Sequence, residues 1–421
     1  MKHCAKTILL MGLLFSVSLC FGSDWPQFRG PNRDGKSAET GLLKSWPKEG
    51  PPLLWQMPGL GKGYSSVSIV GGKLYTMGDR NEEQFVICID PATQKELWAA
   101  KVGGPWGDGP RCTPTVDGER VYAIGTHGDL VCVESAGGKE VWRKNFGKDF
   151  GGKMMTVWGY SESPLVDGDK LVCTPGGPDA MMVALDKKTG ETIWKCAMPN
   201  IGSRGADGAG YASIVPGQVG DVRLYVQITG RGAIGVSADG KFLWGYNKIA
   251  NDTANIPNAI VQDDYVFCTT SYKTGSALLK LVPADGGIKA EEVYFLTPDQ
   301  FENHHGGVVL VDGYIYGGDG QNQGTPVCLE MKTGKIMWKE KPVGDGSAAV
   351  LYADKHLYFR YDNALMALIE ATPTEFKVTG SFELPSKTGP SWPHPVISDG
   401  KLYLRDNDVL LCYDVAEKKA E

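Results

Sequence analysis

The sequence of 421 residues predicts an all-β fold, an eight-bladed β-propeller with four-stranded antiparallel blades. Two observations lead to this prediction. First, one sequence phrase recurs at intervals of about 44 to 52 residues, a period typical of arrays of small sheets. The phrase is an apolar run ending in an acidic residue, then a turn rich in Thr, Gly and Lys, then a Trp. Second, short β-branched runs between the copies are joined by Asp-Gly or Gly-Gly pairs, which favour hairpin turns.

Each repeat is expected to supply four short strands. The clearest copies of the Trp phrase are residues 89–98, 185–194 and 329–338. An alternating run and a tight turn open each repeat, a second strand follows at once, a third strand carries a Cys in several copies, and a fourth carries the Trp. Four antiparallel strands per repeat are typical of a propeller blade. First strands are expected near Val67, Thr115, Leu165, Ser213, Ala259, Val308, Ala349 and Val396.

The two ends of the repeat array complement each other. The last copy stops at residues 413–415 without a fourth strand, and residues 51–55 read as a fourth strand with no blade before it. Pairing the N-terminal strand around Trp55 with the last three strands closes the ring and covers both sheet edges. The sequence therefore predicts a single propeller over residues 51–415, preceded by an N-terminal arm at 23–50 and followed by a C-terminal tail at 416–421.

Residues 1–22 have the features of a signal peptide. Lys2 and Lys6 precede an apolar stretch at 8–21, and small residues follow it. Leu19 stands where a lipoprotein signal needs a small residue, so the sequence does not favour lipid attachment at Cys20. No later apolar run has the length of a transmembrane segment. These features predict a periplasmic or secreted protein.

Composition argues against nucleic acid as a partner. The 43 basic residues are outnumbered by 49 acidic ones, the net charge is −6, and there is no basic tract. Four of the cysteines, Cys88, Cys132, Cys328 and Cys412, share one repeat register in which another copy has Ala184. A position that accepts Ala is small and buried, so we expect mostly free, buried thiols rather than disulfides.

The repeated Trp residues are expected to be structural. A Trp at one register of every outer strand can pack against the neighbouring blade while its indole N–H finds a carbonyl group. The residues predicted to dock neighbouring blades in this way are Trp55, Trp98, Trp142, Trp194, Trp244 and Trp338.

The phrase Asp-x-x-Thr-Gly-Lys-x-x-Trp resembles the tryptophan-docking repeat of the pyrroloquinoline-quinone-like (PQQ-like) propellers, and the resemblance covers roughly residues 51–415. Residues 24–35 and 304–313 resemble an exported bacterial subgroup of this family. The resemblance implies an eight-bladed propeller. It does not select one activity, because the family includes both quinoprotein dehydrogenases and the non-enzymatic propeller of the outer-membrane protein assembly machinery.

A ligand site is expected on one face of the ring. The links from each fourth strand to the next blade lie on the same face as the links between second and third strands, and these links are long and unequal. The alternative is that their polar side chains only satisfy loop backbone groups. The candidate ligand-binding residues on this face are Arg111, Trp158, Glu162, Arg204, Arg231, His304, His305, Asp319, Asn322, Trp392 and His394.

The sequence predicts no metal site. His304 and His305 are adjacent, and in an extended segment their side chains are expected to point to opposite sides, so they could not easily bind one metal together. The spacings of Cys and His that mark known metal sites are also missing from the sequence.

Three functions remain open at this point. The favoured one is an exported, non-enzymatic binding or scaffolding propeller that engages a protein, another cell-envelope partner or a small ligand through its loop-rich face. The alternative implied by the resemblance is a quinoprotein dehydrogenase that oxidises an alcohol or sugar with PQQ and Ca²⁺. The adjacent Cys pair of those enzymes has no counterpart here. The third is a hydrolase using Glu162, Asp319 or a histidine.

Overall fold

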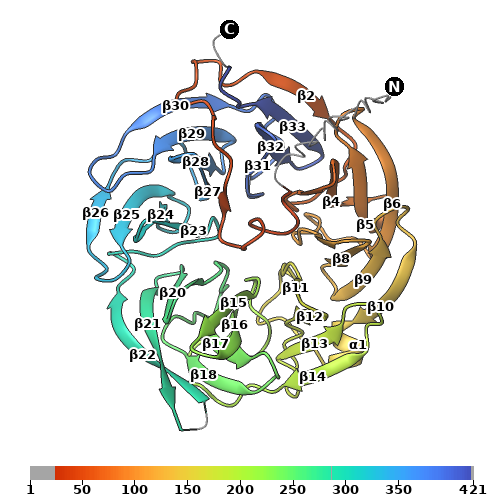
Figure 1. Ribbon diagram of the computed structural model, residues 1–421, viewed down its shortest axis with the longest axis vertical. Coiled ribbons are helices and arrows are strands. Elements are labelled where there is room, and N and C mark those ends of the chain that lie inside the picture. The colour runs from red at the N-terminus through yellow and green to blue at the C-terminus, as the bar shows by residue number, and fades with distance from the viewer. Residues whose placement is uncertain (1–23, 286, 419–421) are drawn as a thin grey trace, which may run out of the picture.

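The computed structural model describes residues 24–285 and 287–418, so the predicted signal peptide at 1–22 lies outside the described residues. Eight sheets, each with four antiparallel blade strands, form a ring around a central axis, as Figure 1 shows. We name them blades A to H in chain order. The one helix in the described ranges is α1 (Phe146–Phe150), in the link between blades B and C. The predicted eight-bladed propeller is confirmed.

Blades A to D contain four strands each. Blade A has β3 (Ser68–Val70), β4 (Lys73–Arg80), β5 (Glu83–Asp90) and β6 (Lys95–Gly103). Blade B has β7 (Thr115–Asp117), β8 (Arg120–Ile124), β9 (Asp129–Glu134) and β10 (Glu140–Asn145). Blade C has β11 (Leu165–Asp167), β12 (Lys170–Cys173), β13 (Met182–Asp186) and β14 (Thr192–Cys196). Blade D has β15 (Val215–Val219), β16 (Val222–Thr229), β17 (Gly232–Ser237) and β18 (Phe242–Tyr246). In each, consecutive strands pair, as the hairpin turns predicted.

Blades E to H follow the same order, with two additions from the N-terminal part of the chain. Blade E has β19 (Ile260–Gln262), β20 (Tyr265–Thr270), β21 (Gly275–Ala284) and β22 (Gly287–Leu296). Blade F has β23 (Val308–Val311), β24 (Tyr314–Asp319), β25 (Thr325–Glu330) and β26 (Ile336–Lys339). Blade G has β27 (Ala348–Ala353), β28 (His356–Tyr361), β29 (Leu365–Glu370) and β30 (Val378–Glu383), with β1 (Lys36–Ser37) added beside β27. Blade H has β31 (Val396–Ser398), β32 (Lys401–Asp406) and β33 (Val409–Asp414), and is completed by β2 (Leu53–Met57).

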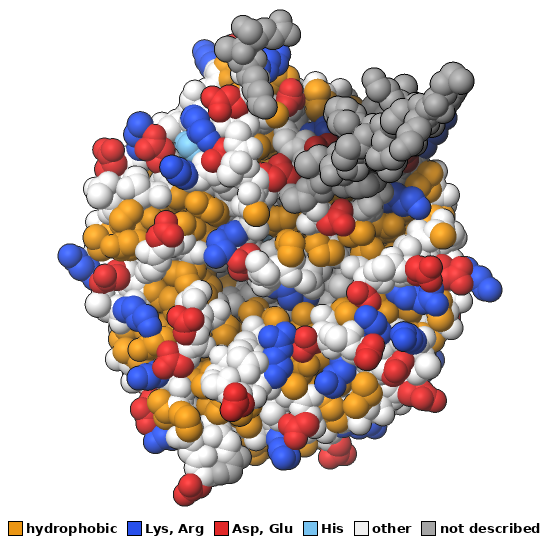
Figure 2. Space-filling view, viewed as in Figure 1, with side chains coloured by type: hydrophobic (Ala, Val, Ile, Leu, Met, Phe, Trp, Pro, Cys, Tyr) orange, Lys and Arg blue, Asp and Glu red, His pale blue; other side chains and the backbone are white. Residues whose placement is uncertain are grey.

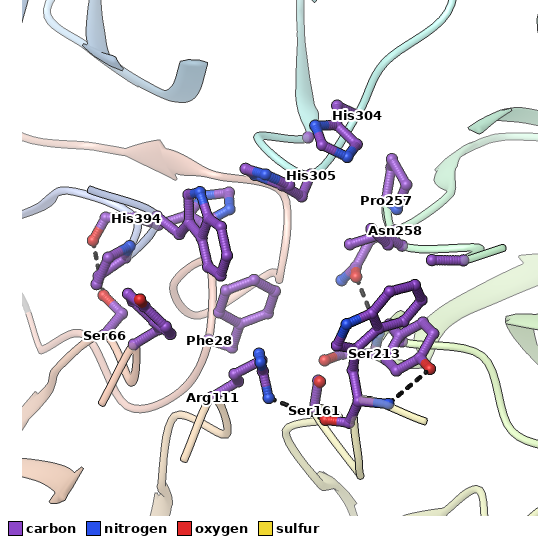
Figure 3. Close-up of a pocket in the computed structure, with 18 of the residues that line it drawn as sticks. Phe28, Ser66, Arg111, Ser161, Ser213, Pro257, Asn258, His304, His305 and His394 are labelled. Carbon is purple, nitrogen blue, oxygen red and sulfur yellow. Dashed lines mark hydrogen bonds between the residues drawn. The ribbon is translucent and has the colours of Figure 1, made fainter. Parts of the chain in front are cut away.

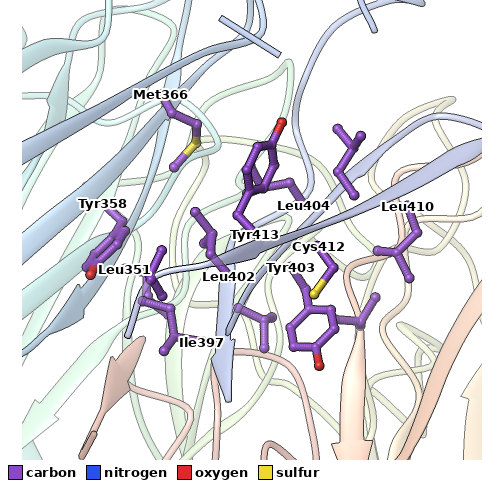
Figure 4. Close-up of a cluster of buried hydrophobic side chains, with 14 of the residues drawn as sticks. Leu351, Tyr358, Met366, Ile397, Leu402, Tyr403, Leu404, Leu410, Cys412 and Tyr413 are labelled. Atoms are coloured by element: carbon purple, nitrogen blue, oxygen red, sulfur yellow. The ribbon is translucent and has the colours of Figure 1, made fainter. Parts of the chain in front are cut away.

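The ring closes as the sequence predicted. Strand β2 pairs antiparallel with β33, and Trp55 lies opposite Cys412. A buried apolar cluster joins blades G and H beneath this closure, and Figure 4 shows part of it. Its members include Leu351, Tyr358, Leu402 and Leu404, none of them more than 1 % exposed. The closure is therefore a packed core as well as a hydrogen-bonded edge.

Four of the repeated Trp side chains donate a hydrogen bond to a backbone carbonyl of the following blade. These pairs are Trp98 with Ser135, Trp142 with Lys187, Trp194 with Ala238, and Trp338 with Thr372, at 2.9 to 3.2 Å. Trp244 differs, because its buried indole nitrogen has no hydrogen-bond partner among the described residues. The glycine of the next blade's turn faces the ring in three cases, Gly138, Gly190 and Gly240. A side chain at those glycines would collide with the indole.

The eight described cysteines are all free and buried, as expected. Burial raises the pKa of several of them, including Cys88 to about 11 and Cys132 to about 12. At neutral pH these groups are thiols rather than thiolates, and they act as small apolar side chains in the blade cores.

The N-terminal arm crosses the centre of the ring, which the sequence did not predict (Figure 1). It pairs with blade A through a bridge between Trp25 and Ile69, and with blade G through β1, which runs parallel to β27. Between these points the Arg33 guanidinium donates to the carbonyls of Ser163 and Pro164, just before the first strand of blade C. The arm therefore contacts the inner strands on several sides of the channel.

The face seen in Figure 2 carries acidic and basic side chains interspersed with apolar ones. Among the described residues, no helix has both the length and the apolar character required to span a membrane.

Candidate functional site

A pocket of about 400 Å³ lies in the central channel at the loop-rich face. All but one of the links between successive blades contribute residues to it, and the 2–3 turns of blades E and F add Tyr272, Gln321 and Asn322. Phe28 and Arg29 of the arm line it as well, so the arm forms part of the pocket wall. The predicted face is the one that carries this pocket.

A chain of hydrogen bonds holds five of these links together just before each first strand. The backbone N–H of each of the first four members donates to the side-chain oxygen of the corresponding residue in the next blade, at 2.9 to 3.2 Å. The members are Ser66, Thr113, Ser163, Ser213 and Asn258, which we call the collar. The corresponding positions on the other side are Gly307 and His394, where the arm contributes Arg29 and Phe28 instead.

A second register faces the pocket. In an extended link, residues two positions apart point to the same side, so the residue two before each collar position also faces the channel. These positions are filled by unlike side chains, namely Tyr64, Arg111, Ser161, Tyr211, Ile256, His305 and Trp392. The collar is uniform and the pocket-facing register is diverse, which is how one repeated scaffold presents a specific surface.

Arg111 and the histidine pair lie on opposite sides of the pocket. Figure 3 shows Arg111 facing the pair His304 and His305, with Phe28 between them. The Arg111 guanidinium donates to both carboxylate oxygens of Asp108, at 2.8 and 3.0 Å, and to the carbonyl of Trp158 at 2.9 Å. Arg111 is thus held in place and neutralised by its own neighbour.

Aromatic side chains form two further sides. Tyr64 and Trp392 are in contact with ring centroids 4.5 Å apart, and Trp158 and Tyr211 form a second pair at 5.9 Å. The two pairs come from links on different sides of the ring. Such rings offer large apolar contact surfaces with polar tips.

The three histidines in the pocket are neutral at physiological pH. Burial lowers the pKa of His304 to about 4 and that of His394 to about 3, the latter helped by the charge of Arg29. Burial also holds the pKa of His305 well below its ordinary value. The His304 ring nitrogens contact Tyr272 Oη at 2.9 Å and Ser347 Oγ at 2.7 Å. The expectation that His304 and His305 point to opposite sides is wrong, because their ring centroids lie 4.1 Å apart.

Seven of the predicted ligand-binding residues line this pocket. They are Arg111, Trp158, His304, His305, Asn322, Trp392 and His394. Arg231 instead lines a second cavity of about 730 Å³ beside blades C and D, where it pairs with Asp207 at 2.7 Å. Arg204 lies nearby and donates to the carbonyl of Lys248. Their role in binding remains a prediction.

Glu162 and Asp319 are buried away from the pocket lining. Glu162 accepts hydrogen bonds from the backbone N–H and hydroxyl of Thr174, and burial raises the pKa of its carboxyl to about 8 despite the nearby Arg33. Asp319 is 4 % exposed, accepts from the backbone N–H of Glu302 and pairs with Lys339 at 2.6 Å. Both carboxyl groups are held by hydrogen bonds within the blades.

Sequence reasoning missed several pocket residues. Tyr64, Tyr211 and Tyr272 lie in links that carry no motif, and Phe28 and Arg29 belong to the arm. One signal could have found Tyr64 and Tyr211. Each stands two residues before a Ser that lies just ahead of a first strand, in the same register as Arg111 and Trp392.

The residues present do not fit a quinone held with a calcium ion. Calcium needs several oxygen ligands. Of the described residues that line the pocket, Asp108 alone is acidic, and both its oxygens accept from Arg111. Nor does any group of three or more His, Cys, Asp or Glu side chains in the described ranges have a geometry that could hold a metal ion.

Comparison with known proteins finds one family. Residues 82–340, more than half of the chain, match the family described as "Outer membrane protein assembly factor BamB". A relative with the same description, from Alteromonas naphthalenivorans, is 26 % identical over 148 residues, which are 32 % of this chain and 35 % of that protein. The match thus spans about a third of the relative.

Solved structures share the fold. A quinohemoprotein alcohol dehydrogenase from Comamonas testosteroni superposes with a TM-score of 0.64 at 14 % identity, covering 95 % of this chain and 81 % of the enzyme. BamB from Moraxella catarrhalis superposes with a TM-score of 0.58 at 12 % identity, covering 88 % of this chain and 99 % of that protein. At such identities the likeness is one of fold, and it includes an enzyme and an assembly factor alike.

Proposed function

This chain belongs to the family described as outer membrane protein assembly factor BamB, and we propose that it is an exported, non-enzymatic binding propeller that engages a protein partner in the cell envelope through its loop-rich face. The signal peptide predicted at residues 1–22 is part of the proposal, and it would deliver the propeller to the periplasm.

The observation that carries the proposal is the apolar rim of the central pocket. Val157 is 76 % exposed and Trp158 is 40 % exposed, and both belong to the link between blades B and C. Exposed apolar side chains beside an aromatic pocket are characteristic of interaction sites. The link is anchored by hydrogen bonds from Thr156 to the carbonyl of Thr253 and between Thr156 and Tyr211, so the rim is presented on a fixed base.

The polar groups around the pocket support binding rather than turnover. The one acidic side chain is paired with Arg111, and the histidines are neutral with His304 hydrogen-bonded on both ring nitrogens. General acid–base catalysis needs a titratable group near the working pH with access to the substrate. The buried Glu162, which has such a pKa, does not line the pocket.

The proposal is tested by site-specific photocrosslinking in the envelope of the producing cell. A photoreactive phenylalanine at Val157 is expected to give a discrete protein adduct that mass spectrometry identifies. The matched control is Val293, which is 47 % exposed on the outer strand β22. Adducts of the same pattern from both positions, or none from Val157, would contradict a protein partner at this face.

A further inference from the structure

Arg29 is a buried cation at the inner end of the pocket without a carboxylate partner. It is 5 % exposed, and its Nη2 group donates to the carbonyls of Asp34 and Val308. Its Nε and Nη1 atoms have no hydrogen-bond partner among the described residues. The nearby Asp34 carboxylate pairs instead with Lys36, at 3.3 Å. Burial lowers the pKa of Arg29 only to about 10, so the group keeps its charge at neutral pH.

The net charge of the pocket lining is therefore positive. Arg111 is offset by Asp108, and the three histidines carry no charge, so the charge of Arg29 remains uncompensated by the described lining residues. The charge of the Asp34 carboxylate favours the charged form of Arg29 without forming a direct ion pair with it. A buried charge without a direct ion pair is unfavourable, and an anion entering the pocket would relieve this. A cationic group would be repelled.

The arm also restricts the ways into the pocket. It crosses the centre of the ring (Figure 1), and Phe28 and Arg29 belong to the pocket lining, with Phe28 packed edge-on against His394 at 5.1 Å between ring centroids. The arm therefore obstructs the passage of a polypeptide through the ring, which favours entry by a chain end. A volume of about 400 Å³ lies in the lower part of the range for ligand pockets and suits a chain end rather than a folded element.

We propose that this pocket binds the C-terminal residue of an extended polypeptide, with the α-carboxylate directed toward Arg29 and an apolar or aromatic side chain held between the Tyr64–Trp392 and Trp158–Tyr211 pairs. The inference rests on the proposed function in taking the partner to be a protein. The same carboxylate chemistry could come from a small aromatic acid, and the test separates the two sources.

The test is fluorescence anisotropy with hexapeptides labelled at the N-terminus and ending in Phe. The peptide with a free carboxylate is expected to bind at least tenfold more tightly than its C-terminal amide. Asp108→Asn should tighten binding of the acid several-fold, since it frees Arg111, and leave the amide unchanged. Arg29→Gln should remove the preference for the acid. The control Arg223→Gln, in an exposed pair with Asp167, should change neither.

Equal affinity for acid and amide, or no binding of either, would overturn the proposal. If 3-phenylpropionate displaces the peptide with an affinity equal to that of the peptide itself, the polypeptide source is wrong. Should Arg29→Gln fail to fold, Asp108→Asn carries the test, because Asp108 lies at the pocket and is not part of the core. Adducts from Val157 without any carboxylate preference would leave the proposed function standing and this inference refuted.

Discussion

The indole Nε1 of Trp142 in blade B donates a hydrogen bond to the carbonyl oxygen of Lys187 in blade C, at 3.2 Å. The same carbonyl accepts from the hydroxyl of Tyr122 at 3.0 Å, and the Lys187 ammonium pairs with Asp117 at 2.6 Å. Three side chains of blade B thus converge on one residue of blade C. We propose that the repeated Trp residues fasten neighbouring blades in this way.

Trp142→Phe tests the indole hydrogen bond. The substitution keeps a ring and removes the N–H, and we expect it to lower the free energy of unfolding by about 1 kcal/mol through the lost bond. Trp244→Phe is the matched control, because the Trp244 nitrogen is buried without a partner among the described residues. Urea unfolding should show the larger loss for Trp142→Phe. A larger loss for Trp244→Phe would refute the fastening role of the hydrogen bond.

Gly190→Ala tests the fit of the Trp142 ring against the turn of blade C. Gly190 has φ of +75°, and a Cβ there would lie 2.8 Å from the indole. Gly168→Ala is the control, with φ of +62° and open space around the added carbon. We expect the left-handed backbone conformation to lower the free energy of unfolding of both variants by about 1 kcal/mol. Gly190→Ala should lose about 1 to 3 kcal/mol more because the added carbon overpacks against the indole. Equal melting temperatures would contradict a tight fit.

Arg33→Met tests the anchoring of the arm. Its guanidinium donates to Ser163 O, Pro164 O and Gln27 Oε1 while being 2 % exposed. Removing these charge-assisted bonds leaves buried carbonyls unpaired, so we expect a loss of about 2 to 4 kcal/mol in unfolding free energy. Arg223→Met, at an exposed ion pair, should lose less than about 1 kcal/mol. Limited proteolysis would show whether the arm is released.

Glu162→Gln tests the protonation of the buried carboxyl. Burial raises the pKa of folded Glu162 to about 8, whereas the unfolded group titrates near 4.5. Between these values the folded state binds more protons, so its stability falls as pH rises from about 4.5 to 8. Glutamine does not titrate, and the variant should lose less stability than wild type between pH 5 and 8.5 in thermal melts. The exposed Glu375→Gln is the control, and a wild-type profile in Glu162→Gln would contradict the prediction.

The quinone alternative is tested with the purified protein. After incubation with PQQ and Ca²⁺ and desalting, we expect no quinone absorbance with the protein. Of the described lining residues Asp108 alone is acidic, and both its carboxylate oxygens already accept hydrogen bonds from Arg111. Heat-denatured protein gives the background for unspecific adsorption. Retention of one quinone per chain would revive the dehydrogenase hypothesis.

The repeat made the fold predictable, and the same repeat explains what was missed. The contact of Trp98 with the next blade and the pairing of Trp55 opposite Cys412 recur at the same position of each repeat, so the spacing of the repeats predicts them. Tyr64 and Tyr211 lie in a register whose side chains differ from blade to blade, so no motif marks them. The sequence did not predict Arg29 as a pocket residue for another reason. Its place in the pocket depends on the arm folding back across the channel, which local pattern does not encode.

The arm and β2 are made before any blade, yet β27 and β33, with which they pair, are among the last strands made. During synthesis the Trp25 bridge can form as soon as blade A is made, but β1 stays unpaired until β27 emerges, and β2 until β33 emerges after seven complete blades. Contacts across the whole sequence then form in one late step, which is slow because long loops must close first. Folding of the blades therefore ends with the closure of the ring. A chain truncated before β33 would leave β2 without its pairing partner, as an exposed strand edge that favours aggregation.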